Sequence, residues 1–599
     1  MTAGDHANCW IEPPLQLHSV ASCISCAKPL LAPASLLPKG HSLVSIPLNL
    51  PDGPGGDMFA TSLHAVRKGC FATAFVICIA SPAAAQPPDG APRLIHGPAS
   101  RPLHLIPPLM PPQDHHEIPL RLVPPGDTGQ PQPDTALQTT ILPSAPNLGY
   151  KFPGVGAGDY GYQVTSAPPD TNGDVGSTQY VQWVNTSFAV FNKADGTLLY
   201  GPAAGNTLWA DLANDPDLGP CATTNDGDPI VQYDQLAGRW VMSQISFNSG
   251  TGYYVCIAVS QSDQAVSAGA LGAWNRYAVI WDSTLPDYAK MSVWPNAYLL
   301  TANMYVKLGL FGWFFSGGQA CALDRSVFIA NGSPTATTLQ CTQAMSSYPS
   351  LLAADLEGST LPPDPSTGFL MNLGSNALNF WKFKVDFNNS SNTILTGPSS
   401  IPVTAFSQAC NACITQKNTT QKLDSLGDRL MFRLAYRNLG SYQSMVLNHS
   451  VNVGSRKSTH AGVRWYELRF NTSGTPVVYQ QGTFSPDANH RWMGSVAMDK
   501  VGNIAVGYSV SGSTMYPAIR YTGRQTTDPT GTLQSEVSVV EGSGSQGPNL
   551  SRWGDYTRMS VDPVDDCTFW YTNEYLKSSG TFNWSTEITR FKFPSCSAP

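Results

Sequence analysis

The segment that decides the fold spans residues 552–575 and reads RWGDYTRMSVDPVDDCTFWYTNEY. Its central part, DYTRMSV at 555–561, closely matches DYAKMSV at 287–293. Each copy leads into an aromatic-rich apolar run, FWYTN at 569–573 and YLLTAN at 298–303. Self-similarity of this kind indicates a repeat architecture.

Two further segments share a plan of apolar strand, Asp/Gly turn and second strand. They read IVQYDQLAGRWVMS (230–243) and SVAMDKVGNIAVG (495–507), and weaker copies bring the total to seven units, which begin near residues 174, 228, 287, 355, 424, 492 and 555. One such unit cannot bury both sheet faces alone, whereas units stacked radially bury a continuous core. The sequence predicts an all-β, seven-bladed β-propeller at residues 150–599. Six or eight blades, or a large two-sheet sandwich, are the alternatives.

Composition agrees with this fold class. Only 13% of residues are charged, and the chain holds 53 Gly and 49 Pro, as in turn-rich all-β proteins. The net charge of −7 and the lack of a basic run argue against a nucleic-acid partner.

The region before the propeller predicts export. From Met58 the chain has a basic start, an apolar run at 70–80 and the small residues of 83–85, which is the pattern of a secretory signal peptide at 58–85. That apolar run is too short to span a bilayer, so we expect no membrane span after cleavage. Residues 1–57 are then a non-native, disordered upstream extension, and the Pro-rich residues 86–149 form a linker or wrapping arm. We expect a secreted or periplasmic monomer.

The cysteines support export. Cleavage after residue 85 leaves eight cysteines. This even number suits four disulfides in an oxidising compartment. Pairing of nearest neighbours joins Cys221 with Cys256, Cys321 with Cys341, Cys410 with Cys413, and Cys567 with Cys596. The last pair would tie the penultimate hairpin to the C-terminal strand, and residues 180–192 would complete the last blade.

Aligning the repeats places an acidic residue just before most of the innermost strands. Six carboxylates would then crowd one mouth of the central channel: Asp174, Asp228, Asp287, Asp355, Asp424 and Asp555. They could accept backbone N–H bonds as turn residues, bind Ca²⁺, or supply an acid/base pair. For the acid/base role the candidates are Asp555, Asp287 and Asp228, with Tyr556 beside the first.

A calcium site has one local pattern in its favour. Asp170, Asn172 and Asp174 follow the D-x-N-x-D spacing of a calcium loop, but Val181 stands where an EF-hand has its Glu. The chain requires no other cofactor by its motifs.

Arginine–tryptophan pairs recur near the repeat starts. The ring of Trp offers an apolar surface to a sugar, and the guanidinium of Arg can donate two parallel hydrogen bonds to a carboxylate. The candidate ligand residues are therefore Arg491, Trp492, Arg552, Trp553 and Arg464. The alternative is that these tryptophans fill cores between blades, as we expect for Trp240.

The strings at 552–575, 491–509 and 227–244 resemble a family of exported bacterial β-propeller proteins, and this resemblance implies export and repeats but no activity. More loosely, the architecture is similar to sialidase-type propellers. Ser560, Asp562, Thr568 and Trp570 match parts of their Asp-box turn, although extra residues intervene and the Gly is missing.

Two functions remain open from the sequence, which does not decide whether the chain is an enzyme. One is the binding or processing of an extracellular glycan, as a glycosidase or lyase, at the channel mouth. The other is a non-catalytic interaction or scaffold role toward a cell-surface ligand, with or without calcium.

Overall fold

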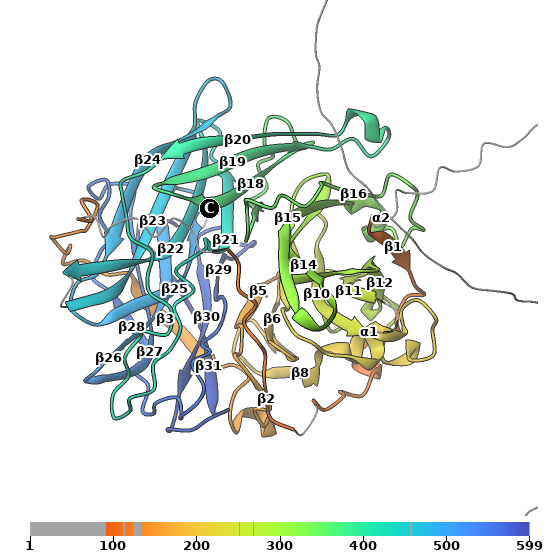
Figure 1. The fold of residues 1–599 in the computed structure, drawn as a ribbon, viewed down its shortest axis with the longest axis horizontal. Coiled ribbons are helices and arrows are strands. Elements are labelled where there is room, and N and C mark those ends of the chain that lie inside the picture. Colours follow the sequence, from red (N-terminus) through yellow and green to blue (C-terminus); the bar gives the residue numbers. More distant parts are fainter. Residues whose placement is uncertain are drawn as a thin grey trace, which may run out of the picture. The chain divides into compact units, whose positions relative to one another are not determined.

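The computed structural model describes residues 91–111, 114–124, 133–248, 250, 252–267, 269–455 and 458–597. The predictions for residues 1–57 and for the signal peptide at 58–85 fall outside this part of the chain. The described residues belong to one unit, Ala85–Pro599. Within it, nearly all regular structure is β-strand (Figure 1).

The strands form successive groups of four antiparallel neighbours in chain order. The first three groups are β5–β8 (Asn172–Val175, Gln179–Val184, Ser187–Asn192, Leu198–Ala204), β9–β12 (Ile230–Asp234, Arg239–Asn248, Gly252–Ser260, Trp274–Trp281) and β13–β16 (Thr284–Val293, Ala297–Lys307, Trp313–Asp324, Leu339–Cys341).

The next groups are β17–β20 (Leu352–Glu357, Thr367–Gly374, Ala377–Lys384, Ile394–Pro402), β21–β24 (Met431–Asn438, Gln443–Ser455, Ser458–Phe470, Pro476–Phe484) and β25–β28 (His490–Met498, Ile504–Gly512, Met515–Arg524, Val537–Val540). The last group joins β29–β31 (Arg558–Val561, Phe569–Leu576, Trp584–Lys592) with β3 (Asn147–Pro153). A parallel pairing of β17 with β21 links two groups into one larger sheet.

The first strand of each group lies at a common centre. Each contacts the first strand of the next group, and β29 contacts β5, so that the series closes on itself. Figure 1 shows the groups following one another around this centre. This is the arrangement of a β-propeller. The repeat starts expected from the sequence lie in or within three residues of these strands, except the one near residue 424, which lies seven residues before β21.

The N-terminal segment closes the last group, but by a different strand from the one expected. β3 pairs antiparallel with β31, from Asn147↔Lys592 to Pro153↔Glu587. The expected closing residues, 180–192, instead form β6 and β7 of the first group. They are buried between two neighbouring sheets, and the strand that pairs with β31 comes from farther upstream in the chain.

The Pro-rich arm is built into the sheets. β1 (Arg93–His96) adds an edge strand to β12, and β2 (His116–Glu117) pairs parallel with β4 (Ser166–Ala167). Leu103 of this arm is fully buried. The arm therefore takes part in the packing that surrounds the candidate site.

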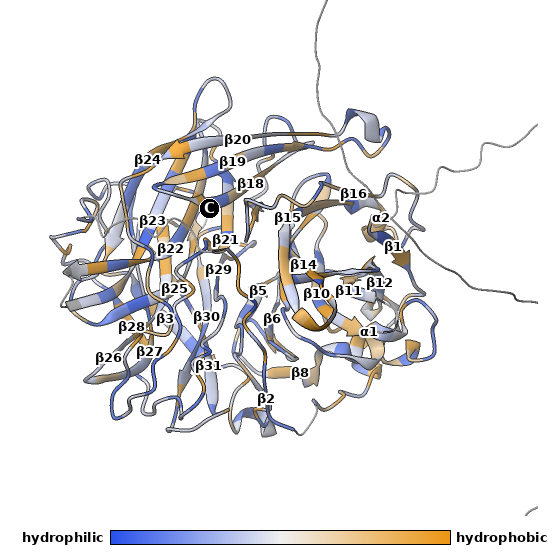
Figure 2. Ribbon diagram, in the orientation of Figure 1, coloured by the Kyte–Doolittle hydropathy of each residue, from blue (hydrophilic) through white to orange (hydrophobic). Residues whose placement is uncertain are grey.

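Burial on both sheet faces explains why many strands read as continuous apolar runs. In β6, Val181 and Trp183 enter one core between sheets, while Tyr180 and Val184 enter the next. Figure 2 shows the resulting hydrophobic colouring of the strands. A strand with only one covered face would alternate instead.

The four disulfides confirm the predicted pairing. Cys221–Cys256, Cys321–Cys341, Cys410–Cys413 and Cys567–Cys596 are all present. Such bonds persist in oxidising compartments, which agrees with an extracellular or periplasmic location.

The helices are short. They are α1 (Gly219–Thr223), α2 (Arg325–Ile329) and 3-10 segments at Leu103–Leu105, Asp159–Gly161, Gly205–Leu212, Ala270–Gly272, Gly309–Phe311 and Ser390–Asn392. Among the described residues, no helix has the length and apolar composition to cross a membrane.

Candidate functional site

The six aspartates expected at one channel mouth lie in two separate groups. Asp228, Asp287, Asp424 and Asp555 gather at one end with Asp170, and we call these five the mouth cluster. Asp174 and Asp355 lie in a different ion-pair network with Arg558. Asp174 lies within β5, whereas Asp170 precedes that strand and has a left-handed backbone with φ 43°, so the two carboxylates lie at different ends of the strand.

A cavity of about 170 Å³ opens at the mouth cluster. Its wall includes Asp228, Asp287, Asp555, Tyr288 and Arg552. The first strands of the groups position these side chains, since Asp228 precedes β9, Asp287 lies in β13 and Asp555 precedes β29. Three of the predicted catalytic residues thus share one cavity, and Arg552 is the predicted ligand residue that joins them.

Several mouth carboxylates accept backbone N–H bonds from neighbouring groups. Asp170 Oδ1 accepts the Asp555 N–H at 2.7 Å, and Asp228 Oδ2 accepts the Tyr288 N–H at 2.6 Å. Asp424 Oδ1 accepts the Trp553 N–H at 3.4 Å. These bonds hold the central strands together, which is the turn role that the sequence offered for the aspartates.

Two cations compensate the carboxylates from inside. Arg552 Nη1 lies 2.6 Å from Asp555 Oδ1 and 3.3 Å from Asp424 Oδ2. Lys290 Nζ lies over two aromatic rings, 3.6 Å from the ring centre of Tyr288 and 4.0 Å from that of Tyr556. Such cation–π contacts stabilise an ammonium that has lost water.

Tyr556 therefore has a different place from the one expected. Its ring supports Lys290, and its hydroxyl donates to the Pro229 carbonyl at 2.9 Å. Burial and nearby carboxylates, Asp170 first among them, raise the pKa of Tyr556 well above its usual range. Tyr288, rather than Tyr556, faces the cavity.

Burial shifts the pKa of several of these acids upward, toward the neutral form. It raises the pKa of Asp287 to about 6 and of Asp424 to about 7, although Arg121 and Arg552 respectively oppose the shift. Burial raises the pKa of Asp228 and, well above its usual range, that of Asp170. Burial also lowers the pKa of Lys290, against the attraction of the same carboxylates.

The N-terminal arm crosses the mouth cavity. Residues 116–121 form part of its wall. Arg121 Nη1 lies 2.5 Å from Asp287 Oδ1, and Arg552 Nε donates to the Ile118 carbonyl at 3.2 Å. The Ile118 N–H is bound in turn by the Ala167 carbonyl at 2.7 Å. The arm thus supplies a cation to one of the candidate catalytic acids.

Arg121 and Lys290 were not predicted from the sequence as site residues. Lys290 had a usable signal, because the repeat alignment matches it with Arg558, and each is a cation directly before the shared residues Met-Ser-Val of a buried strand. Arg121 had none, since nothing in a Pro-rich segment indicates which residue returns to the centre.

The proposed calcium residues do not converge. Asn172 Oδ1 accepts the Val231 N–H at 2.6 Å, and Asp174 pairs with Arg558. Asp170 instead approaches Asp228 and Asp555, with one oxygen of each within 4.8 Å of the others. A calcium ion needs six to eight oxygen ligands, whereas Lys290 and Arg552 lie among these carboxylates, so the residues do not fit such an ion.

Most of the predicted ligand residues lie away from the mouth. Trp492 and Trp553 are fully buried in one core with ring centres 5.9 Å apart, so neither offers a free ring face. Arg491 pairs with Asp487 and Glu536, and Arg464 pairs with Asp134. These residues reinforce packing instead. Trp240 is buried, as expected.

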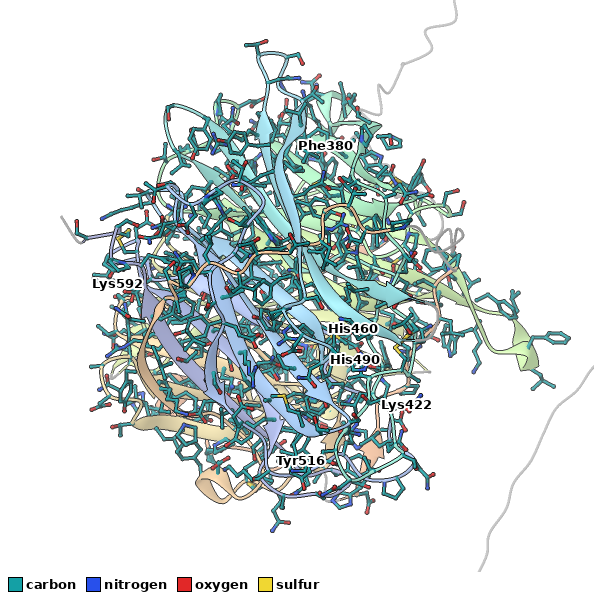
Figure 3. The ribbon with its side chains drawn as sticks, turned by 90° about the vertical axis from the view of Figure 1, so that its left-hand side faces the viewer. Phe380, Lys422, His460, His490, Tyr516 and Lys592 are labelled. Carbon is teal, nitrogen blue, oxygen red and sulfur yellow. A yellow bond between two sulfur atoms is a disulfide. The ribbon has the colours of Figure 1, made fainter. Side chains whose placement is uncertain are left out.

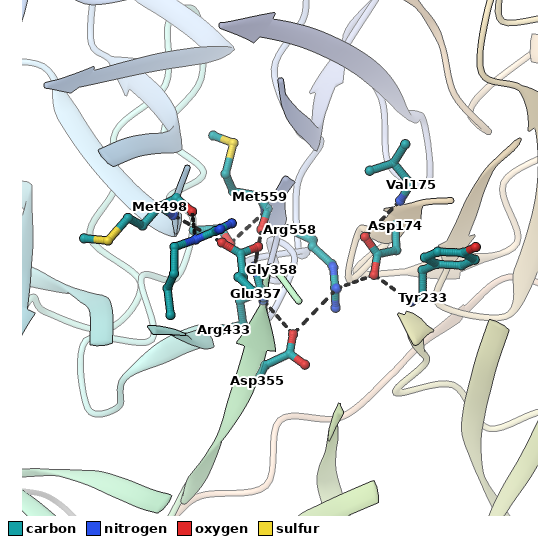
Figure 4. A network of polar contacts seen from close by, with 12 residues as sticks. Asp174, Val175, Tyr233, Asp355, Glu357, Gly358, Arg433, Met498, Arg558 and Met559 are labelled. Atoms are coloured by element: carbon teal, nitrogen blue, oxygen red, sulfur yellow. Dashed lines mark hydrogen bonds and ion pairs between the residues drawn. The ribbon is translucent and has the colours of Figure 1, made fainter. Parts of the chain in front are cut away.

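The opposite end of the channel is closed by paired charges (Figure 4). Arg558 Nη2 lies 2.5 Å from Asp174 Oδ2, and Arg433 binds Asp355 at 2.7 Å and Glu357 at 2.5 Å. The cavity here measures only about 30 Å³, which is room for about one water molecule. We take this network of ion pairs at the opposite end of the channel to be structural.

His490 lies beside His460 (Figure 3). Its Nδ1 accepts the Ala461 N–H at 3.0 Å. Burial, with the nearby charges of His460 and Lys422, lowers its pKa to about 4. The neutral imidazole of His490 accepts a hydrogen bond that links β23 and β25, which is a structural role.

No family model and no curated protein matches this sequence. Among solved structures, the chain is similar to a GH43 endo-arabinanase from Bacillus licheniformis, with 10% identity and a TM-score of 0.24 over 51% of this chain and 96% of that one. It is also similar to the N-terminal domain of Nup159, with 8% identity and a TM-score of 0.30 over 76% of this chain and 99% of that one. Likeness at these scores carries no argument about activity.

Proposed function

We propose that this chain is a secreted, seven-bladed β-propeller that binds a glycan at the mouth cavity and processes it with the carboxyl groups there. The observation that carries the proposal is the placement of Asp228, Asp287 and Asp555 around one cavity beside Arg552. The blade number is supported by the seven four-stranded groups of the described residues and by the contact between β29 and β5.

The chemistry proposed for the cavity is acid/base catalysis by two carboxyl groups. Glycoside hydrolysis needs one carboxyl that keeps its proton near neutral pH and one that is ionised. Asp287 suits the acid, because burial raises its pKa to about 6. Asp555, ion-paired with Arg552, suits the base or nucleophile. Asp228 is the alternative to Asp555 in this role. The ring of Tyr556 supports Lys290 among the mouth carboxylates.

Access to this cavity depends on the arm. A volume of about 170 Å³ is below the roughly 300 Å³ of small ligand sites. We therefore propose that a glycan displaces residues 116–121 and that a hydroxyl of the sugar takes the place of Arg121 on Asp287. Arg552, which loses its bond to the Ile118 carbonyl, then gains a donor site for the ligand.

A panel of extracellular glycans, incubated with the purified chain and analysed for released products, tests this function. We expect turnover of at least one glycan, a loss of at least 100-fold in Asp287→Asn and Asp555→Asn, and no loss in the exposed control Asp195→Asn. Turnover that is equal in all four proteins would exclude the mouth carboxyls from the reaction.

A non-catalytic interaction role is the second candidate. It is favoured by the backbone N–H bonds that Asp170, Asp228 and Asp424 accept, because such bonds already satisfy part of each carboxylate. In that case Asp287→Asn would bind the same glycan or surface ligand as the unmodified chain, and no product would form with either protein.

A further inference from the structure

The hairpin between β14 and β15 ends in an apolar tip that has no partner in the described chain. The tip spans residues 307–315 and reads KLGLFGWFF. Leu310 is fully exposed, Phe311 is 86% exposed, and Leu308 and Phe314 are about half exposed. Figure 2 shows hydrophobic colouring in this hairpin. Large apolar side chains gathered at one exposed point mark an interaction site.

The tip is held in one conformation rather than left as a loose loop. The Leu308 N–H donates to the Gly312 carbonyl at 3.0 Å, and the Phe311 N–H donates to the Leu308 carbonyl at 2.9 Å. Gly309 and Gly312 have φ values of 53° and 93°, which glycine adopts without strain. The turn therefore directs Leu310 and Phe311 outward.

The residues behind the tip suit the boundary between water and lipid. Trp313 is partly buried at the base of the hairpin and stacks edge-on against Tyr253 at 5.4 Å. Lys307 Nζ lies 5.9 Å from the Trp313 ring centre, and residues 308–323 contain no charged side chain. Segments that enter a membrane interface have this order of residues: Leu and Phe at the tip, Trp behind them and Lys at the rim.

The size of the tip favours a lipid surface over a protein partner. At about 200 Å² for a fully exposed large apolar side chain, the four residues present about 600 Å². A standard protein interface takes about 800 Å² from each partner and requires a matching shape. A convex tip of this area needs no such match to enter lipid, and its single flanking charge is complementary to anionic headgroups.

We propose that the tip at 307–315 docks the protein on an anionic lipid surface, with Leu310 and Phe311 inserted among the acyl chains. This interaction does not depend on the proposed catalytic function. The tip lies near the mouth cavity, because Trp313 contacts Tyr253, Tyr253 contacts Phe247, and Phe247 forms part of the cavity wall beneath Arg121.

Flotation with phosphatidylcholine vesicles that contain phosphatidylglycerol tests the proposal. We expect the chain to float with the vesicles and the variant Leu310→Ser/Phe311→Ser to lose at least tenfold in apparent affinity. Both side chains are exposed, so the melting temperature should not change. The matched control Leu199→Ser/Leu361→Ser removes two exposed leucines from other strands and loops and should bind like the unmodified chain.

Quenching by brominated lipid gives a second readout at a named residue. We expect partial quenching of tryptophan fluorescence on binding, lost in Trp313→Phe while flotation persists. Equal flotation of the tip variant and the unmodified chain would overturn the proposal. So would tip-dependent self-association in light scattering without flotation, which would assign the tip to a second copy of the chain.

Discussion

At the scale of single residues, Lys290 balances the charge of the mouth cluster. Its ammonium is buried over the rings of Tyr288 and Tyr556, and Asp228 and Asp170 attract it most strongly. Removing one member of a buried group of opposite charges leaves the others without compensation. The stability of the folded state then falls by more than the original ion pair had added.

Lys290→Met should therefore lower the free energy of unfolding by about 3–5 kcal/mol at pH 8, as measured by denaturant titration. The loss should shrink toward pH 5. The folded pKa values of Asp228 and Asp170 are already raised, and they rise further without Lys290, so protonation at low pH removes the repulsion. The exposed control Lys384→Met should change stability by less than about 0.5 kcal/mol. A loss that does not vary with pH would contradict this role.

The sequence predicted which residue types meet at the centre better than which end each residue occupies. Asp287 and Asp555 were placed in one cavity because the DYAKMSV and DYTRMSV repeats align without a gap, and Asp228 joins them although its unit lacks that string. Asp174 was aligned where Asp170 belongs. A shift of four residues keeps the same face of a strand, so the alternation of side chains could not reveal the error.

At the scale of elements, pairing of β3 with β31 closes the series of sheets. Gly149 lies at an irregular point of this pairing, where a β-carbon would come within 2.3 Å of the Arg590 carbonyl oxygen. That close approach requires a residue without a side chain.

Gly149→Ala should separate β3 from β31 and lower the free energy of unfolding by about 1–3 kcal/mol, measured by thermal or denaturant unfolding. In Gly332→Ala the added carbon would meet its nearest atom at 3.4 Å, an ordinary contact, so this control should stay close to the unmodified chain. An unchanged stability in Gly149→Ala would show that the β3 pairing does not contribute to closure.

The link between β23 and β25 depends on His490 in its neutral form. Its folded pKa is about 4, below the usual 6.5, so the unfolded chain binds the proton more tightly than the folded one. This contribution to stability is present above about pH 6.5 and is lost as the pH falls toward 4.

His490→Asn, whose amide oxygen can still accept the Ala461 N–H, should remove this pH dependence. Between pH 7 and pH 4 the unmodified chain should lose on the order of 2–3 kcal/mol more than the variant. Comparing the two proteins cancels the opposing effect of acids such as Asp287. Parallel stability curves in urea across this pH range would contradict the structural role of His490.

At the scale of the whole molecule, repeats, strand groups and disulfides were predictable from the sequence, whereas the path of the arm was not. Nearest-neighbour pairing succeeded because Cys321 and Cys341 face each other on adjacent strands β15 and β16. The arm has no such local rule. Its strands pair with β12 and β4, which are distant in sequence, so only the tertiary structure shows that Arg121 reaches Asp287.

The arm also defines the central claim, that the mouth cavity is a glycan site held closed by residues 116–121. Replacing Arg121 removes the ion pair that holds the arm on Asp287, yet this change leaves every mouth carboxylate in place. A glycan that competes with the arm should then bind more easily, since the arm no longer has to be displaced against a buried charge pair.

The most direct test is equilibrium titration of the unmodified chain and of Arg121→Ser with the glycans of the panel. We predict that at least one glycan binds both proteins and binds Arg121→Ser at least tenfold more tightly, with the gain abolished when Arg552→Gln is added. Weaker or equal binding by Arg121→Ser, or no glycan binding by either protein, would contradict the claim.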